Sequence, residues 1–280
     1  MEHIGHGVHQ VWRDSFNESD SYINFFIEHG FSLGAYITVG PTFAPYGSLH
    51  LLPIVFTQNS TSYRGLYLYA LGTILTKRGE GYGKQLVNKA KKFAYRTGAN
   101  FIILQPTDNV LFEYYRKLGF NMPVFRSCLK CTRADLSALY LSRNRLTEYL
   151  LPLSTTKEQM KVLGHFAWES FMLNYIKKEC LFRGGAVING AYCYPNTDVD
   201  GDFLEIKEFC ASIDEIPGMV QLIMATFPSI ERFSFYGKIA QSGSTQVPAV
   251  QSVFALACFL KPELENAYNP ELGYFALGLD

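Results

Sequence analysis

The chain has 280 residues, of which 48% are hydrophobic and 18% are charged, so it holds enough apolar material for a sizeable core and is not a disordered chain. Lysine plus arginine and aspartate plus glutamate each number 25, and the resulting net charge of zero argues against a global attraction to nucleic acid or anionic membranes. We therefore expect any recognition of an anion to be local.

The N-terminal segment has no basic stretch followed by an apolar run, so we expect no signal peptide. No apolar run reaches the roughly 18 residues that a membrane-spanning helix needs. Six scattered cysteines predict reduced thiols and a cytoplasmic protein. Cys128 and Cys131 form a Cys-x-x-Cys pair, but no second pair with zinc-ligand spacing accompanies it. We expect buried or edge thiols here and no metal site.

The first predicted elements are helical. Residues 10–29 have apolar side chains at helical spacing, and Ser19 stands where it would cap a second helical segment. The next two segments, 33–39 and 48–56, are rich in β-branched and aromatic residues, and the turn formers between them predict a hairpin. A third strand is expected over residues 65–75.

A glycine-rich loop, Arg78-Gly79-Glu80-Gly81-Tyr82-Gly83, follows this strand and precedes a helical pattern from Lys84 to Arg96. Glycines at every second position expose backbone N–H groups, and the start of a helix adds unpaired donors and the positive end of its dipole. Such a loop can bind a phosphate. Taken alone, it is equally well interpreted as a plain glycine turn between two elements.

A short buried strand over 100–105 and a second helix over 109–118, ended by Gly119, complete the first half. The order strand, glycine loop, helix, strand and helix predicts an α/β unit. In such units the ligand crevice lies at the carboxyl ends of the strands.

The second half is expected to follow a helical, charged segment at 133–151, with a domain boundary near 145–155. Beyond it the patterns predict a helix over 156–178 and strands over 185–192 and 203–211. A helix over 217–227, a strand over 232–236 and a tail over 262–280 follow. Strand, helix and strand from 203 to 236 repeat the order around the glycine loop. The loop Ser212-Ile213-Asp214-Glu215 has two carboxylates and no glycine, so a second phosphate site is not expected there.

Two motifs carry a resemblance. Tyr69-Ala70-Leu71-Gly72-Thr73-Ile74, followed by the loop of residues 78–83, resembles the acyl-CoA-binding motif of the GNAT N-acetyltransferase superfamily, an Arg/Gln-x-x-Gly-x-Gly/Ala loop after the fourth strand. Residues 111–120 resemble its second signature, a helix ending Tyr-x-x-Leu-Gly-Phe. The resemblance covers about residues 10–125. Residues 49–53 and 273–280 are further similar to a bacterial subgroup with a degenerate second acetyltransferase-like domain.

The resemblance implies an α/β fold with an α+β mixed sheet, the acyl-CoA N-acyltransferase (GNAT) fold, in two tandem GNAT-like domains. A GNAT acetyltransferase domain would occupy residues 1–148. A degenerate GNAT-like domain without the phosphate loop would occupy residues 149–280.

The cofactor that the resemblance implies is acetyl-CoA, a form of coenzyme A. A strand that splays from its neighbour leaves backbone groups free for the pantetheine amides. Asp108 stands where the superfamily often has an Asn that contacts the cofactor, and Asn109 could substitute. A basic helix face could assist the 3′-phosphate, although a solvated face is the commoner explanation of such lysines: Lys84, Lys89, Lys91 and Lys92. The predicted cofactor-binding residues are Leu71, Gly72, Thr73, Arg78, Gly79, Glu80, Gly81, Tyr82, Gly83, Lys84 and Asn109.

Tyr115 matches the tyrosine that, in the superfamily, donates a proton to the departing thiolate. A phenol with a pKa of about 10 suits a thiolate leaving group with a pKa of about 8.5. The alternative is a packed aromatic beside Tyr114 and Phe112.

The general base is not evident. Many members of the superfamily have a Glu on the fourth strand, but residues 66–75 contain no acid. His50, whose ordinary pKa is near 6.5, Glu113 and the carboxylates at Asp280 are candidates. Water, or an amine with a lowered pKa, could replace a base.

The implied function is transfer of an acetyl or short acyl group from acyl-CoA to a primary amine, by direct attack in a ternary complex. The acceptor would be a small molecule or a peptide, and no nucleic acid or membrane partner is expected. One alternative is a non-catalytic acyl-CoA-binding regulatory module, because residues 66–75 lack the carboxylate that a general base would supply. Another is an aminoacyl-tRNA-dependent ligase, which zero net charge disfavours.

Overall fold

A computed structural model describes residues 2–141, 143–150, 164–209, 211–212, 214–237, 250–270, 273–275 and 278–279. The strands in this part of the chain are β1 (Ala35–Val39), β2 (Gly47–Gln58), β3 (Thr61–Thr73), β4 (Phe101–Leu104), β5 (Met122–Thr132), β6 (His165–Trp168), β7 (Ala186–Ile188), β8 (Ala191–Asp198), β9 (Gly201–Lys207), β10 (Arg232–Gly237) and β11 (Val250–Phe259). They form one mixed sheet in the order β1-β2-β3-β4-β11-β5-β10-β9-β8-β7, and β6 pairs with β2 beside that path.

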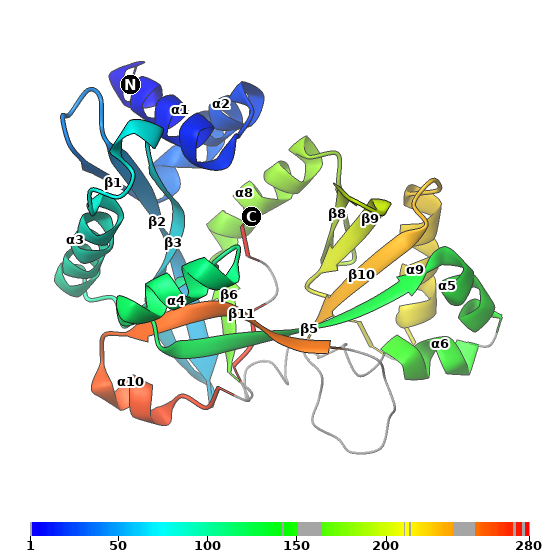
Figure 1. Ribbon diagram of the computed structural model, residues 1–280. Coiled ribbons are helices and arrows are strands. Elements are labelled where there is room, and N and C mark those ends of the chain that lie inside the picture. Colours follow the sequence, from blue (N-terminus) through cyan, green and yellow to red (C-terminus); the bar gives the residue numbers. More distant parts are fainter. Residues whose placement is uncertain are drawn as a thin grey trace.

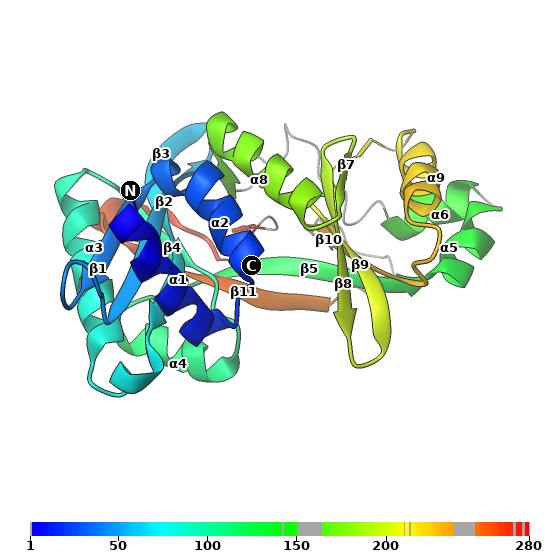
Figure 2. The same ribbon diagram turned by 90° about the horizontal axis from the view of Figure 1, so that it is seen from above.

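Helices cover both halves of this sheet (Figure 1). Those in the described residues are α1 (Glu2–Phe16), α2 (Asp20–His29), α3 (Tyr82–Arg96), α4 (Asn109–Lys117), α5 (Arg133–Tyr140), α6 (Arg143–Leu150), α8 (Ser170–Phe182), α9 (Ile216–Thr226) and α10 (Pro262–Ala267), with 3₁₀ turns η1 (Phe31–Leu33) and η2 (Leu75–Lys77). Figure 2 shows α1, α2 and α8 lying above the same side of the sheet. None of the described helices is long and apolar enough to cross a membrane.

The first half follows the predicted order. Ser19 caps α2 by accepting a hydrogen bond of 3.3 Å from the backbone N–H of Tyr22. β1 and β2 form the predicted antiparallel hairpin, β3 pairs antiparallel with β2, and β3, α3 and β4 form a parallel unit. Gly119, with a left-handed φ of 85°, follows the end of α4, as expected for a helix stop.

The second half repeats this parallel unit. β9, α9 and β10 have the predicted order, and β9 pairs in parallel with β10. The strand predicted over 185–192 is a hairpin of the two short strands β7 and β8. Before α9, Glu215 accepts hydrogen bonds of 2.8 and 2.7 Å from the backbone N–H and hydroxyl of Ser212. A side-chain carboxylate therefore already occupies donors that a phosphate would need.

The predicted helix over 156–178 is wrong in its middle. Residues 156–163 lie outside the described residues, residues 165–168 form strand β6, and α8 begins at Ser170. Phe166 and Trp168 are buried while the residues before and between them are partly exposed, which is the alternation of a half-buried strand. β6 pairs with residues 54–57 of β2.

Two long strands that the sequence patterns did not predict, β5 and β11, join the halves. β5 pairs with β10 on one side and β11 on the other, and β11 pairs with β4. Charged residues interrupt the apolar pattern of β5. One of them, Arg126, lies over the rings of Tyr236 and Phe254, with its guanidinium carbon 4.1 and 3.9 Å from their centroids. The Cys-x-x-Cys pair lies on β5 as free thiols, with no group of three metal-ligating side chains among the described residues.

The division into residues 1–148 and 149–280 stays a prediction, and the strand pairing constrains it. β6 and β11 follow residue 148 but pair with β2 and β4, which precede it. The largest apolar cluster likewise combines Trp12 and Tyr67 with Trp168 and Phe275. Any domain boundary must therefore leave shared strands and a shared core between the two halves.

Candidate active site

A cleft of about 1080 Å³ opens where β3 and β4 diverge. These parallel strands pair at Leu66–Ile102 and Tyr67–Ile103, and their carboxyl ends separate beyond that point. The cleft is lined by α1, β3, the glycine loop, the end of β4, α4 and the last described residue: Trp12, Ser15, Phe16, Glu18, Tyr67, Leu68, Tyr69, Ala70, Leu71, Gly72, Thr73, Lys77, Arg78, Gly79, Gly81, Tyr82, Gly83, Lys84, Leu104, Gln105, Pro106, Thr107, Leu111, Tyr114, Tyr115 and Leu279.

The backbone of β3 bulges beside the cleft. Ala70 has a left-handed φ of 50°, and the register of β3 against β2 shifts at this point. The predicted residues Leu71, Gly72 and Thr73 line the cleft directly after the bulge. Gly72 allows α1 to pack closely, because a Cβ at this position would lie 2.4 Å from the hydroxyl oxygen of Ser15. The bulge and the divergence together leave this part of β3 without a neighbour on the β4 side.

The glycine loop presents bare backbone at the start of α3. Gly79 and Gly81 have left-handed φ values of 83° and 82°, and a Cβ on either would meet no atom within 4 Å. Gly81 is the N-cap residue of α3 and has no side chain to accept from the first-turn N–H groups. An exposed set of N–H donors at a helix N-terminus fits a pyrophosphate. The geometry therefore suits the phosphate role predicted for this loop.

Side chains of the loop anchor it to α1 and to β3. The Arg78 guanidinium donates to the backbone carbonyls of Asp14 and Thr73. The Asp14 carboxylate accepts a hydrogen bond of 3.0 Å from the backbone N–H of Leu75. These contacts hold the first residues of the loop against α1 and β3.

Two of the predicted cofactor-binding residues, Glu80 and Asn109, do not line the cleft. Glu80 is exposed, forms an ion pair of 3.2 Å with Lys77 and is not among the cleft-lining residues. Asn109 is also exposed and does not line the cleft. Its neighbour Asp108 caps α4 by accepting a hydrogen bond of 2.8 Å from the backbone N–H of Leu111. Asp108 therefore has a structural task that explains a carboxylate at this position.

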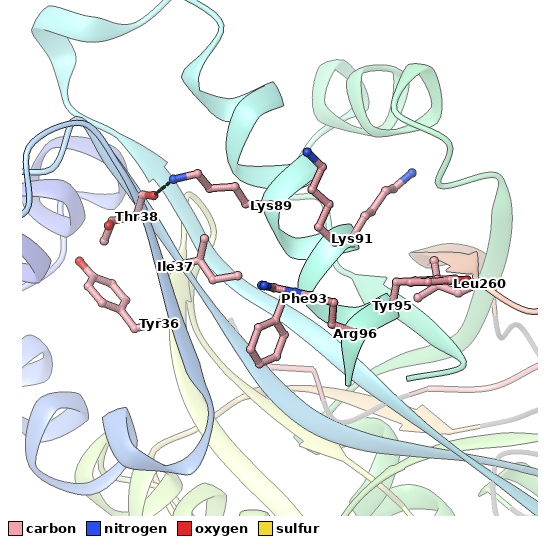
Figure 3. A pocket seen from close by; sticks show the side chains of 10 residues that line it. Tyr36, Ile37, Thr38, Lys89, Lys91, Phe93, Tyr95, Arg96 and Leu260 are labelled. Carbon is pink, nitrogen blue, oxygen red and sulfur yellow. Dashed lines mark hydrogen bonds between the residues drawn. The ribbon is translucent and has the colours of Figure 1, made fainter. Parts of the chain in front are cut away.

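The basic face of α3 is divided between two places. Lys84 lines the cleft, whereas Lys89, Lys91 and Lys92 line a second hollow of about 870 Å³ between α3 and β1 (Figure 3). Lys89 donates a hydrogen bond of 2.8 Å to the carbonyl of Thr38, drawn dashed in Figure 3, and Lys91 donates to the carbonyl of Leu118. The structure thus brings only Lys84, of the four lysines, to the cleft.

Two tyrosines of α4 reach the cleft. Tyr115 is 7% exposed, and its ring centroid lies 5.2 Å from that of Tyr114 and 5.9 Å from that of Phe120. Burial, and secondarily the neighbouring Tyr114, raises the pKa of Tyr115, so this phenol keeps its proton. Tyr114 faces the loop, since a Cβ at Gly83 would lie 2.8 Å from its hydroxyl oxygen. Both phenols are therefore available as proton or hydrogen-bond donors.

His50 does not line the cleft. It is fully buried in β2, and the rings of Phe26, Phe31 and Tyr36 each lie 4.8 Å from its ring centroid. Neither ring nitrogen has a hydrogen-bond partner in the described part of the chain. Burial lowers the pKa of His50 to about 3, so the imidazole is neutral at ordinary pH. The geometry favours a packing role over the predicted role as general base.

The lowered pKa of His50 predicts a pH-dependent stability. The unfolded chain binds a proton on this imidazole below about pH 6.5, whereas the folded chain does not until about pH 3. Stability is therefore complete above pH 6.5 and falls as pH drops, by about 2 kcal/mol between pH 7 and pH 5. Urea denaturation of the wild type and His50→Leu at both pH values measures this. An equal loss in the two proteins would contradict it.

The other candidate bases lie elsewhere. Glu113 is exposed on α4, pairs with Arg116 at 2.6 Å and is absent from the cleft-lining residues. Asp280 lies outside the described residues, so its candidacy stays a prediction. Leu279, next to it in sequence, does line the cleft, and its carbonyl accepts a hydrogen bond of 3.0 Å from the Tyr67 hydroxyl.

Sequence reasoning missed the aromatic end of the cleft, which is formed by Trp12, Phe16, Tyr67 and Tyr69. Glu18 lines the same end and is the only carboxylate among the described residues of the cleft wall. The sequence did contain one signal. Tyr67 and Tyr69 are two residues apart on a strand, so they share a face, and that face meets α1 and not α3.

Comparison with known proteins agrees with this geometry. Residues 5–122 match the family model of the acetyltransferase (GNAT) domain. A search of curated proteins gives no match. A GCN5-related N-acetyltransferase from Kribbella flavida superposes with a TM-score of 0.59 and 12% identity, over 91% of this chain and 68% of that chain.

Two further solved structures are similar. One is a conserved protein of unknown function from Enterococcus faecalis, a probable N-acyltransferase, with a TM-score of 0.60 and 12% identity over 91% of this chain and 69% of that chain. The other is Eis1 from Mycobacterium abscessus, with a TM-score of 0.57 and 11% identity over 94% of this chain and 73% of that chain. These likenesses extend through both halves, so the expectation of a GNAT fold with a mixed sheet is confirmed.

Proposed function

We propose that this protein, whose residues 5–122 match the family model of the GNAT acetyltransferase domain, transfers an acetyl or short acyl group from acyl-CoA to a primary amine of a small molecule or peptide. One observation carries the proposal. The glycine loop at the start of α3, the end of β3 beyond its pairing with β4 and the side chain of Tyr115 all line the same cleft. These are the parts needed to hold a pyrophosphate, bind an amide-containing arm and protonate a leaving thiolate.

In the proposed complex the loop N–H groups bind the pyrophosphate, with Arg78 and Lys84 supplying positive charge nearby. On the side away from β2, the backbone of residues 71–73 pairs with the pantetheine amides, as a sheet edge pairs with a peptide. Bound acetyl-CoA supplies the thioester carbonyl and the thiolate leaving group. A cleft of about 1080 Å³ leaves room for an acceptor beside it.

Direct transfer suits the side chains that surround the cleft. No cysteine lines it among the described residues, and the Ser15 hydroxyl donates a hydrogen bond of 3.2 Å to the carbonyl of Thr73. The wall thus offers no activated nucleophile to carry the acyl group. The amine nitrogen forms its bond to the carbonyl carbon, the carbon–sulfur bond breaks, and Tyr115 gives its proton to the sulfur. The nitrogen releases one proton to water as the amide forms, and Tyr115 regains its proton from water.

A non-catalytic acyl-CoA-binding module is the second candidate, favoured because Glu18 is the one carboxylate among the cleft-lining residues that the structure describes. Release of free thiol from acetyl-CoA, followed with a panel of small amines, amino acid amides and peptides, separates the two. An enzyme gives thiol release that depends on the amine and saturates with it. A binding module gives tight acetyl-CoA binding by calorimetry and no release with any amine of the panel.

A further inference from the structure

Glu179 of α8 is a buried carboxylate that no step of the proposed reaction uses. It is 3% exposed and belongs to the second half of the chain. Its Oε2 accepts a hydrogen bond of 2.9 Å from the Tyr194 hydroxyl. Its Oε1 accepts from Nε of Arg183 and, at 3.4 Å, from the Tyr22 hydroxyl of α2. Arg183 pairs with this buried carboxylate and so compensates its charge.

This network continues to the wall of the cleft. The hydroxyl oxygens of Tyr22 and Tyr69 lie 2.9 Å apart, and Tyr69 is one of the residues that form the aromatic end of the cleft. Trp12 packs against both rings, with centroid distances of 6.3 and 5.7 Å. A continuous hydrogen-bonded chain therefore runs from Glu179 through Tyr22 to Tyr69. It crosses from the second half of the protein into the first.

Glu179 sets the direction of the hydrogen bonds in this chain. An ionised carboxylate can only accept, and each phenol has one proton to donate. Burial raises the pKa of both Tyr22 and Tyr69, so both stay neutral. When Tyr22 donates to Glu179, its oxygen must accept from Tyr69. The oxygen of Tyr69 is then left with a lone pair and no proton to give.

α8 contacts the aromatic end of the cleft through a second residue, Arg183. The Arg183 guanidinium lies over the ring of Tyr22 at 4.0 Å, and its Nη2 is 3.8 Å from Oε2 of Glu18. Glu18 is the carboxylate that lines the cleft. The polar groups at this end, Glu18, Tyr22 and Tyr69, thus contact residues of the second half, although they belong to the α1–α2 connection, α2 and β3 of the first half.

On the basis of the proposed function, we propose that Glu179 is a positioning residue that turns the Tyr69 oxygen into a hydrogen-bond acceptor for an N–H of the acceptor amine. In this arrangement Tyr69 holds the nitrogen at the aromatic end of the cleft, where apolar walls exclude water. The second half of the chain then contributes to recognition of the acceptor, and not to binding of acyl-CoA.

The test compares variants of matched size with an amine substrate at saturating acetyl-CoA. In Glu179→Leu, a change to an apolar side chain of similar size, no acceptor remains for Tyr22, so Tyr22 can donate to Tyr69 and Tyr69 would present its proton to the amine. We expect KM for the amine to rise about 10- to 100-fold, the range for a lost hydrogen bond of a charged group. The Kd of acetyl-CoA, measured by calorimetry, should stay unchanged. Tyr69→Phe should give a similar rise, and the double variant should show no further rise.

Tyr194→Phe is the matched control, because it removes an equally buried hydrogen bond to Glu179 without touching the chain to Tyr69. It should leave KM within about threefold. A rise equal to that of Glu179→Leu would show a merely structural role and overturn the proposal. Tyr22→Phe is a second test that leaves Glu179 paired with Arg183, and an unchanged KM in this variant would also overturn it. Absence of turnover in the wild type would instead remove the proposed function, and the inference with it.

Discussion

Gly81→Asp is expected to remove measurable binding of acetyl-CoA. The residue is at the N-cap of α3, with a left-handed φ of 82° and no atom within 4 Å of an added Cβ, so the side chain has space. Aspartate tolerates this backbone conformation. A carboxylate about 4 Å from a phosphate charge costs about 4 kcal/mol near a protein surface, and screening by salt leaves a loss of at least about 100-fold in affinity. Calorimetric titration with acetyl-CoA measures it.

Two controls separate charge from shape and from folding. Gly81→Asn has nearly the same size and backbone tolerance but no charge, so it should weaken binding much less than Gly81→Asp. Gly98 follows the other end of α3, also with a left-handed φ, at 74°, and open space around its Cβ. Gly98→Asp should bind acetyl-CoA normally, although its carboxylate faces the negative end of the helix dipole and should make it somewhat less stable than Gly81→Asp. Unchanged affinity in Gly81→Asp would remove the pyrophosphate role of the loop.

Tyr115→Phe is expected to lower kcat by about 10²- to 10⁴-fold, the usual range for loss of a general acid. The phenol lines the cleft and keeps its proton because burial raises its pKa. Phenylalanine preserves the edge-on contacts with Tyr114 and Phe120, so the fold and the Kd of acetyl-CoA should be unchanged. Steady-state kinetics with saturating acetyl-CoA and amine, beside calorimetry with acetyl-CoA alone, measure the two quantities separately.

Tyr114→Phe is the matched control for this variant. Tyr114 is adjacent in sequence, also lines the cleft and places its hydroxyl beside Gly83 of the loop. If Tyr115 is the acid, Tyr114→Phe retains kcat within a few-fold and alters the affinity for acetyl-CoA more than turnover. The reverse pattern would assign the acid to Tyr114. Normal turnover in both variants would leave Tyr115 as a packing residue.

The backbone geometry of the glycine loop was predictable because it depends on local sequence. A short stretch of sequence contains the strand, the glycines and the start of the helix. Gly79 and Gly81 have the left-handed φ that glycine permits. The same holds for Ser19 as an N-cap and Gly119 as a helix stop. Each of these depends on a few neighbouring residues only.

The aromatic end of the cleft was not predictable because it depends on segments that are distant in sequence. Strands β6 and β11 reach the first half from residues 165–168 and 250–259, and pairing of this range leaves no local pattern. Tyr69 is recognisable as a strand residue, but nothing near it in sequence indicates that Glu179, on α8, orders its hydroxyl through Tyr22. His50 illustrates the opposite case. Its ordinary pKa suggests a base, whereas its burial among aromatic rings favours a neutral packing residue.

The proposed function is tested most directly by counting acetylated amine against thiol released, using mass spectrometry and a thiol reagent on the same wild-type reaction. Transfer by direct attack predicts one acetylated amine for each thiol, with no acetyl group retained on the protein when the amine is omitted. Thiol release without acetylated amine would indicate hydrolysis. Firm binding of acetyl-CoA with neither product would contradict an acetyltransferase.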